Sequence, residues 1–196
     1  MLKFRMSVLL LIFTLTIVSC SDSSEEVPCT ADTTIDFPTS TITQIEPNKH
    51  RVYTDIVING SAEEVWNILT DFTNMPDWSS SFQGLSGEIN NNSEVTITYI
   101  LPSPTTGEPT ESQFNRTLSY IEGQQFGWST ESTTFPGIID NHIFKVEAIS
   151  DCQSRFIQTD EYQGTNSFFT TNDLANASIP LYNQFNTELK GEVEKQ

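Results

Sequence analysis

The chain has 196 residues, of which 26 are acidic and 9 are basic, and 11% are aromatic. This length predicts one domain with an additional terminal segment, and the aromatic content is too high for a fully disordered chain. The formal net charge of −17 at pH 7 argues against nucleic-acid binding, which needs clustered Lys and Arg. Three Cys and two His are too few for a disulfide scaffold and leave little material for a zinc site, so we expect no metal and no cofactor.

Residues 1–19 have the pattern of a secretory signal peptide. Lys3 and Arg5 precede an apolar run over residues 6–18, which is too short to span a bilayer as a stable helix. The run ends in Ile17-Val18-Ser19-Cys20, which resembles the lipobox of bacterial lipoproteins. This resemblance implies that Cys20 becomes the lipidated first residue of the mature protein. An ordinary signal peptide with an incidental Cys is the alternative.

A lipidated Cys20 would anchor the protein to a membrane of the bacterial cell envelope. We expect the outer membrane. The acidic stretch at residues 21–26 resembles the tether of surface-exported lipoproteins, and a plain soluble linker is the alternative. Residues 20–49 have no persistent apolar period, so they are predicted to be the lipidated Cys and a flexible acidic tether. The folded domain is then expected over residues 50–196.

The other cysteines are far apart in the sequence. Cys29 lies in the predicted tether and Cys152 in the predicted domain. With Cys20 acylated, they form an even pair in an oxidising compartment. A bridge between them would fasten the tether to the domain, and two separate thiols are the alternative.

The domain begins with a strand and a capped helix. Residues 52–58 alternate as expected for a strand, and Asn59-Gly60 predicts a turn. Ser61 and Glu64 match a capping box, in which each side chain accepts a hydrogen bond from the other residue's backbone N–H. A second short helix is expected before Trp78, limited by Pro76.

Six further strands and a final helix are expected after Trp78. Turn signals separate the strands, which are predicted at residues 82–89, 94–101, 113–121, 125–132, 138–149 and 154–162. Even spacing without intervening helices predicts an antiparallel meander. Tyr182, Phe185, Leu189 and Val193 recur on one face of a helix. Its start is open between Ser178 as N-cap, with Pro180 in the first turn, and residue 172, in which case Pro180 would kink it.

This order of elements, with Ser61-Ala62-Glu63-Glu64-Val65-Trp66 and Met75-Pro76-Asp77-Trp78, resembles the START-like (SRPBCC) superfamily. The opening block is similar to its polyketide cyclase/dehydrase branch. The resemblance implies an α+β helix-grip fold (β-αα-β6-α), in which a curved antiparallel sheet wraps around the long C-terminal helix. It also implies a cavity for a small hydrophobic molecule. Aromatic residues are the candidates for its lining: Trp78, Phe82, Tyr99, Phe114, Trp128, Phe144, Phe156, Tyr162, Tyr182 and Phe185.

Few residues suggest a specific reaction. His142 and Glu161 are the candidate catalytic residues, because a buried imidazole or carboxyl group can act as a general acid or base. For each, a solvated or structural side chain is the alternative. Arg116 would clamp a carboxylate ligand or pair with a surface acid.

Three functions remain open from the sequence. The first is a membrane-tethered binder or carrier of a small hydrophobic molecule or lipid. The second is an enzyme of the cyclase/dehydratase type, which requires at least two polar groups that converge in the cavity. The third is a cell-envelope module that binds other proteins through its acidic surface. The sequence names neither the ligand nor a reaction.

Overall fold

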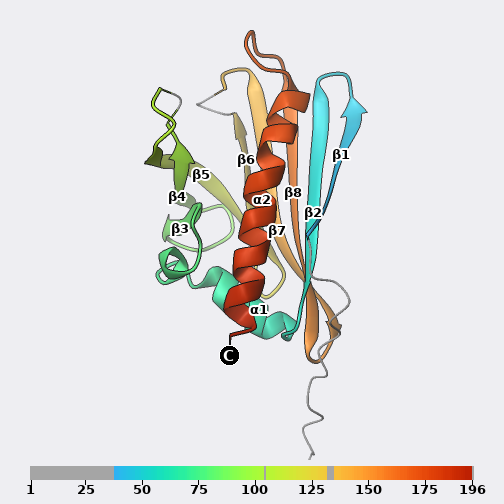
Figure 1. Ribbon diagram of the computed structural model, residues 1–196. Coiled ribbons are helices and arrows are strands. Elements are labelled where there is room, and N and C mark those ends of the chain that lie inside the picture. Colours follow the sequence, from blue (N-terminus) through green and yellow to red (C-terminus); the bar gives the residue numbers. More distant parts are fainter. Residues whose placement is uncertain (1–37, 104, 132–134, 196) are drawn as a thin grey trace, which may run out of the picture.

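The computed structural model describes residues 38–103, 105–131 and 135–195, and structural statements below refer to these residues. One antiparallel sheet has the strand order β1-β2-β8-β7-β6-β5-β4-β3, and α2 lies across its concave face (Figure 1). The elements are β1 (Thr39–Glu46), β2 (Lys49–Ile58), α1 (Ala62–Thr70), the 3₁₀ helix η1 (Met75–Asp77), β3 (Phe82–Gly87), β4 (Glu94–Pro102), β5 (Pro109–Ile121), β6 (Gln125–Glu131), β7 (Ile138–Ser150), β8 (Gln153–Gly164) and α2 (Thr171–Val193). The α+β helix-grip fold predicted from the sequence is confirmed.

The domain begins earlier than the sequence predicted. Residues 39–46 form the edge strand β1, which pairs with β2 from Thr39–Asp55 to Glu46–Lys49. The predicted tether of 20–49 is therefore wrong for its last part, and the remaining tether residues up to 37 lie outside the described residues. The strand was missed because its polar Thr and Gln side chains show no apolar alternation, while backbone hydrogen bonds to a neighbouring strand hold it in place.

Both helices begin at capping boxes. Ser61 and Glu64 cap α1 as predicted, with Glu64 N donating to Ser61 Oγ at 3.1 Å. Thr170 and Asp173 cap α2 in the same way. Ser178 is therefore no N-cap, and its hydroxyl donates to Leu174 O one turn earlier. Pro180 lies inside α2, where its missing N–H leaves one helical carbonyl without its usual donor.

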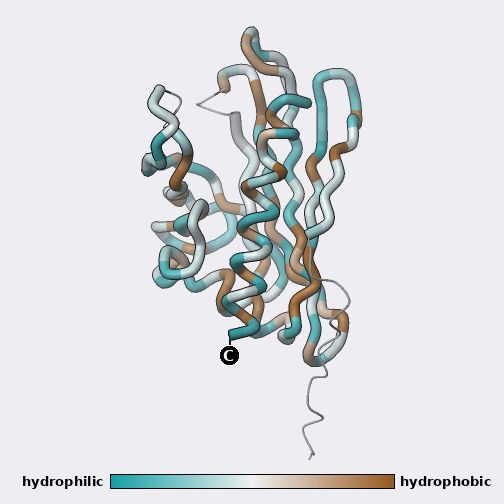
Figure 2. The backbone as a smooth tube through the Cα atoms, viewed as in Figure 1, coloured by the Kyte–Doolittle hydropathy of each residue, from teal (hydrophilic) through white to brown (hydrophobic). Residues whose placement is uncertain are grey.

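The space between α2 and the sheet is filled in three layers. Toward α1 lies a large apolar cluster, and the strands behind α2 are most hydrophobic at this end (Figure 2). A small cluster around Val52, Ile138 and Leu174 lies toward the opposite end. Between the two clusters lies a layer of buried and half-buried polar side chains, which we call the polar layer: Thr54, Asp140, His142, Gln158, Asp160, Tyr162, Ser178, Tyr182 and Asn186.

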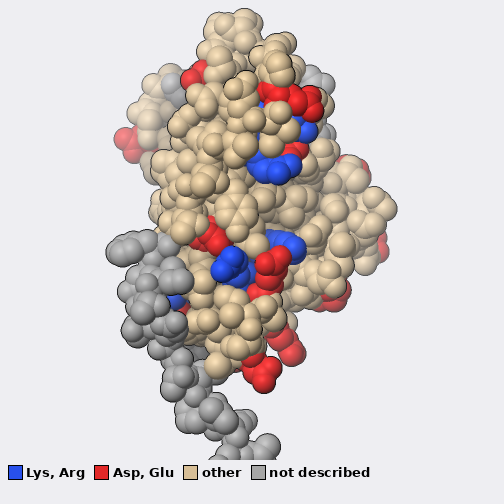
Figure 3. Space-filling model, turned by 90° about the vertical axis from the view of Figure 1, so that its right-hand side faces the viewer, with Lys and Arg blue, Asp and Glu red and all other residues tan. Residues whose placement is uncertain are grey.

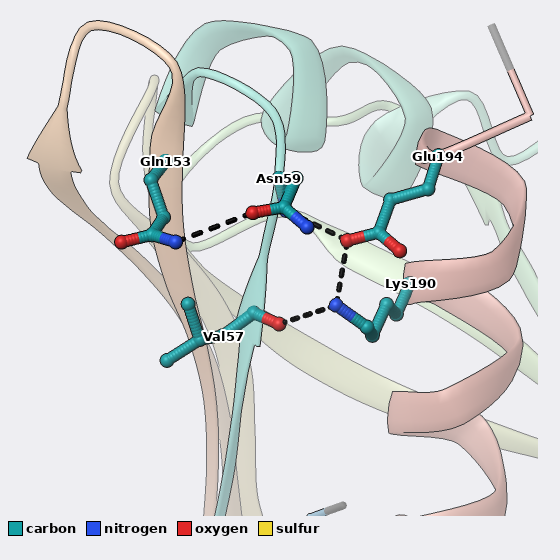
Figure 4. Close-up of polar contacts among 5 residues, drawn as sticks. All are labelled: Val57, Asn59, Gln153, Lys190 and Glu194. Carbon is teal, nitrogen blue, oxygen red and sulfur yellow. Dashed lines mark hydrogen bonds and ion pairs between the residues drawn. The ribbon is translucent and has the colours of Figure 1, made fainter. Parts of the chain in front are cut away.

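Hydrogen bonds fasten the C-terminal end of α2 to the junction between β2 and α1 (Figure 4). Lys190 Nζ donates to Val57 O at 3.0 Å and pairs with Glu194 at 2.6 Å. Glu194 in turn accepts from Asn59 N at 2.8 Å, and Gln153 Nε2 donates to Asn59 Oδ1 at 3.2 Å. We call these contacts the Lys190 clamp. A cation at this position also compensates the negative end of the helix dipole.

Charges of both signs are interspersed on the side of the molecule formed by β1 and β2 (Figure 3). Lys49 and Arg51 both pair with Glu161, and Arg155 pairs with Asp55. No helix within the described residues is long and apolar enough to cross a membrane. Cys20 and Cys29 lie outside the described residues, and Cys152 lies in the turn between β7 and β8. The Cys29–Cys152 bridge therefore stays a prediction.

Candidate functional site

Strand register places the acidic and aromatic members of the polar layer on one face. Asp140 is opposite Tyr162, and His142 is opposite Asp160, in the antiparallel pairing of β7 with β8. Side chains two positions apart on a strand point the same way, so these four share the inner face with Phe144, which is 1% exposed. The site is therefore built on the adjacent strands β7 and β8, whose inner-face side chains meet those of α2.

A chain of amides fixes the hydrogen-bonding state of His142. Gln158 Nε2 donates to Asn186 Oδ1 at 2.5 Å and to Tyr182 O at 3.2 Å, and Asn186 Nδ2 donates to Thr54 Oγ1 at 3.1 Å. Gln158 Oε1 must then accept, and it lies 3.1 Å from His142 Nε2. Nε2 is accordingly the protonated nitrogen of His142. Burial lowers the pKa of His142 to about 4, so the imidazole is neutral at neutral pH.

Aspartates 140 and 160 form a buried carboxyl pair. Burial, followed by the neighbouring charge of Asp160, raises the pKa of Asp140 well above its usual value. Burial also raises the pKa of Asp160, while hydrogen bonds from Asp140 and Tyr182 act in the opposite direction. Within the described residues, Oδ1 of each carboxyl group is buried without a hydrogen-bond partner. Both groups therefore offer hydrogen-bonding capacity to the interior.

Tyrosines connect this pair to α2. The Tyr182 hydroxyl donates to Asp160 Oδ2, and it lies 3.1 Å from the Tyr162 hydroxyl. The Tyr162 hydroxyl lies 2.6 Å from Ser178 Oγ. Since Ser178 donates its own proton to Leu174 O, Tyr162 is the donor in that contact. Burial raises the pKa of both tyrosines well above the usual value, so both remain protonated donors.

Arg116 extends the site to β5. It lies opposite Val95 of β4, and it is 6% exposed. Of the two alternatives given for Arg116 from the sequence, the structure contradicts the surface ion pair. The reason is the period of two along β5, which puts Arg116 on the same face as the buried Leu118.

The candidate lining residues occupy two different environments. Phe82, Trp128, Phe144, Phe156 and Phe185 are buried in the large apolar cluster, where the rings of Phe82 and Phe144 stack with centroids 5.3 Å apart. Trp78, Tyr99, Phe114, Tyr162 and Tyr182 lie at its margin or in the polar layer. The first group therefore forms packed core, and the second group is the one positioned to meet a ligand.

A pocket of about 320 Å³ lies at the end of the domain opposite α1. The loop between β8 and α2 and the end of the β6–β7 connection line it: Phe135, Pro136, Thr165, Asn166, Ser167, Phe168 and Phe169. None of these was among the candidate lining residues. Polar loop residues with isolated aromatics carry no periodic signal, so the sequence alone gave no reason to bring these loops together.

Glu161 lies on the outer face, where it pairs with Lys49 at 3.0 Å and with Arg51. Burial acts to raise the pKa of Glu161, but hydrogen bonds from Arg51 and Lys49 and their charges lower it overall. Of the two catalytic candidates, only His142 therefore belongs to the interior site. Sequence reasoning missed Asp140 and Asp160, although the alternation from His142 and from Phe156 would have placed both on the inner face.

The described residues contain no group of three or more His, Cys, Asp or Glu side chains that could hold a metal ion. His142 can accept or donate a proton, the carboxyl pair and the tyrosines can exchange hydrogen bonds with a ligand, and Arg116 can bind an anion.

An antiparallel sheet that wraps around a long C-terminal helix, with polar groups enclosed between them, is the helix-grip fold of START-like domains. A family model described as polyketide cyclase/dehydrase and lipid transport matches residues 49–194. The chain belongs to this family, and the family predicted by the sequence resemblance is confirmed. No curated protein sequence matches the chain.

Solved structures show the same fold at low sequence identity. A START superfamily protein from Mycobacterium smegmatis has a TM-score of 0.57 at 14% identity, covering 74% of this chain and 97% of its own. Zhui aromatase/cyclase from Streptomyces sp. R1128 has a TM-score of 0.56 at 11% identity, covering 75% and 94%. A conserved protein from Geobacillus kaustophilus has a TM-score of 0.53 at 15% identity, covering 74% and 95%.

Proposed function

We propose that the protein is a membrane-tethered binding or carrier domain for a small, mostly apolar molecule. The observation that carries the proposal is the polar layer between two apolar clusters. A layer built only to stabilise the fold would satisfy its own hydrogen bonds, since an unsatisfied buried polar atom costs about 1–3 kcal/mol. Here Asp140 Oδ1 and Asp160 Oδ1 lack partners in the described part of the chain. A ligand with an apolar body and a hydrogen-bonding end matches these surroundings.

Native mass spectrometry tests the binding function. We expect the protein purified from its own membrane to carry a bound small molecule that is released when the protein is denatured. Tyr182→Phe removes the hydroxyl that donates to Asp160 and so disturbs the carboxyl group that a ligand would meet. We expect ligand affinity to fall by about tenfold, which corresponds to roughly one hydrogen bond in the interior.

Tyr53→Phe is the matched control for this substitution. Tyr53 is on the outer face of β2, and its change should leave ligand occupancy unaltered. Protein that carries no small molecule in any preparation, and that binds no apolar fluorescent probe, would contradict the proposal.

An enzyme of the cyclase/dehydratase type is the second candidate. The observation in its favour is that His142 and the Asp140–Asp160 pair converge on one inner face, as acid–base chemistry requires. The same mass measurement separates the two functions. A carrier returns its ligand unchanged, whereas a dehydratase returns a product that has lost one water.

The tether is the remaining part of the proposed function, and it rests on the lipobox-like sequence that ends in Cys20. Replacement of Cys20 by Ser removes the thiol that would be acylated. We expect this variant to leave the membrane fraction or to remain an uncleaved precursor. Unchanged fractionation and unchanged processing would show that residues 1–20 do not anchor the protein in this way.

A further inference from the structure

Arg116 is a buried cation that is not paired with any acidic side chain in the described part of the chain. Its residue is 6% exposed, and no ion pair joins it to an acidic side chain within the described ranges. Its Nη1 donates to Asn115 O at 3.0 Å, and its guanidinium lies 5.3 Å from the centre of the Phe114 ring. Nε is buried and has no hydrogen-bond partner there. Burial of an unpaired guanidinium is costly, and an acidic protein has many carboxylates with which to avoid that cost.

The ionisable groups that interact electrostatically with Arg116 do not take the place of an acidic partner. The charge of Arg116 acts on Asp140 and on Tyr99, which places all three in one electrostatic environment. Burial nevertheless dominates at Asp140 and shifts that carboxyl group toward its neutral form. Among the residues that the structure describes, the positive charge of Arg116 is therefore only partly compensated.

The sheet is discontinuous next to Arg116. The ladder between β5 and β6 runs only from Ile121–Gln125 to Leu118–Trp128. Beyond Leu118 the strand β5 continues in pairing with β4, and β6 continues in pairing with β7. Arg116 lies just beyond the last β5–β6 pair, so the two strands can be separated beside its side chain without loss of a backbone hydrogen bond.

We propose that Arg116 binds the carboxylate of an otherwise apolar ligand through the Nε–Nη2 edge of its guanidinium. This edge matches the two oxygens of a carboxylate, because its N–H groups are parallel and Nη1 is already engaged. The rings of Tyr99 and Phe114, with centroids 6.4 Å apart, provide apolar contact for the body of the ligand. The proposal rests on the proposed function, since it names the ligand class that the same interior site takes.

Paired probes test this assignment in the full-length protein held in an amphipol. We expect cis-parinaric acid, a fluorescent fatty acid, to bind about tenfold or more tightly than its uncharged methyl ester, as measured by energy transfer from tryptophan. Arg116→Gln should weaken binding of the acid to the level of the ester and leave the ester unaffected. Arg51→Gln, at an outer-face ion pair, is the matched control and should change neither affinity.

Each outcome decides between the proposals. Equal binding of acid and ester by the unaltered protein overturns the role of Arg116 while the binding function stands, and this comparison does not depend on a folded variant. Unaltered acid binding by Arg116→Gln also overturns that role. Failure of the unaltered protein to bind either probe overturns the proposed function and this inference together. Displacement of the probe by dodecyl phosphate more readily than by dodecanoate would contradict the carboxylate and indicate a phosphate instead.

Discussion

Replacement of Phe185 by Ala is expected to lower the free energy of unfolding by about 3–5 kcal/mol. Phe185 is 2% exposed. Its ring lies 5.2 Å from Trp78, 5.8 Å from Phe82, and 5.9 Å from Phe156, measured between centroids. These contacts come from the residue that follows η1, from the edge strand β3 and from β8, so one side chain joins α2 to parts of the sheet that lie several strands apart. A loss of this size is a large part of the total stability of a typical domain.

Urea unfolding measures this effect, and Phe168→Ala is its matched control. Phe168 is 84% exposed, so the same chemical change should cost no more than about 0.5 kcal/mol. If Phe185 instead lines a cavity that is open to solvent or ligand, truncation of its side chain creates no new enclosed cavity. The loss of stability should then be small. In that case the affinity for an apolar probe should change more than the stability does. A variant unaltered in both respects would contradict the packing of α2 described here.

His142 should make the protein less stable in acid. The pKa of a free imidazole is near 6.5, and burial lowers that of His142 to about 4. Between these values the unfolded chain binds a proton that the folded protein does not bind. The contribution of His142 to the free energy of unfolding is therefore fully present above pH 6.5, and it is lost as the pH falls toward 4. By pH 4 the expected loss is about 3 kcal/mol.

The Asp140–Asp160 pair changes the free energy of unfolding with pH in the opposite direction. The effect of His142 is therefore measured by comparing the unaltered protein with a His142 variant at two pH values. Burial raises the pKa of Asp140 and Asp160, and their contribution declines as the pH rises above their unfolded values. We expect the stability advantage of the unaltered protein over His142→Phe to shrink by about 3 kcal/mol between pH 7 and pH 4, because the aspartates are common to both proteins. An advantage that is constant across this range would show that His142 is not buried in neutral form.

The fold could be predicted from the sequence because its signals are local. The Ser61–Glu64 capping box fixes the start of α1, and the apolar positions Phe185, Leu189 and Val193 of α2 are buried as expected. The start of α2 was left open between Ser178 and residue 172, and the structure places it at Thr171. Thr170 and Asp173 form an equally good capping box, but residues 171–180 are polar enough to read as a loop, and contacts with the sheet hold them helical.

The site was predicted less well than the fold, for a different reason. Adjacent strand residues point to opposite faces, so an error of one position exchanges an interior group for a surface group. Asp160 and Glu161 are such neighbours, one 1% exposed and the other in surface ion pairs. For Arg116 the sequence left a surface ion pair open beside a ligand-binding role, because charged residues usually lie at the surface. The alternation of β5 was the available evidence to the contrary.

The Lys190 clamp has a consequence for how α2 is positioned along its own axis. The apolar stripe of α2 repeats about every turn, so a helix shifted by one turn, or about 5.4 Å, would still present apolar side chains to the sheet. Hydrophobic contact therefore aligns the helix without defining its longitudinal register. Directional bonds from Lys190 to Val57 O and from Asn59 to Glu194 are satisfied at one register alone. Tyr182 is thereby brought level with Asp160 by contacts formed two turns away.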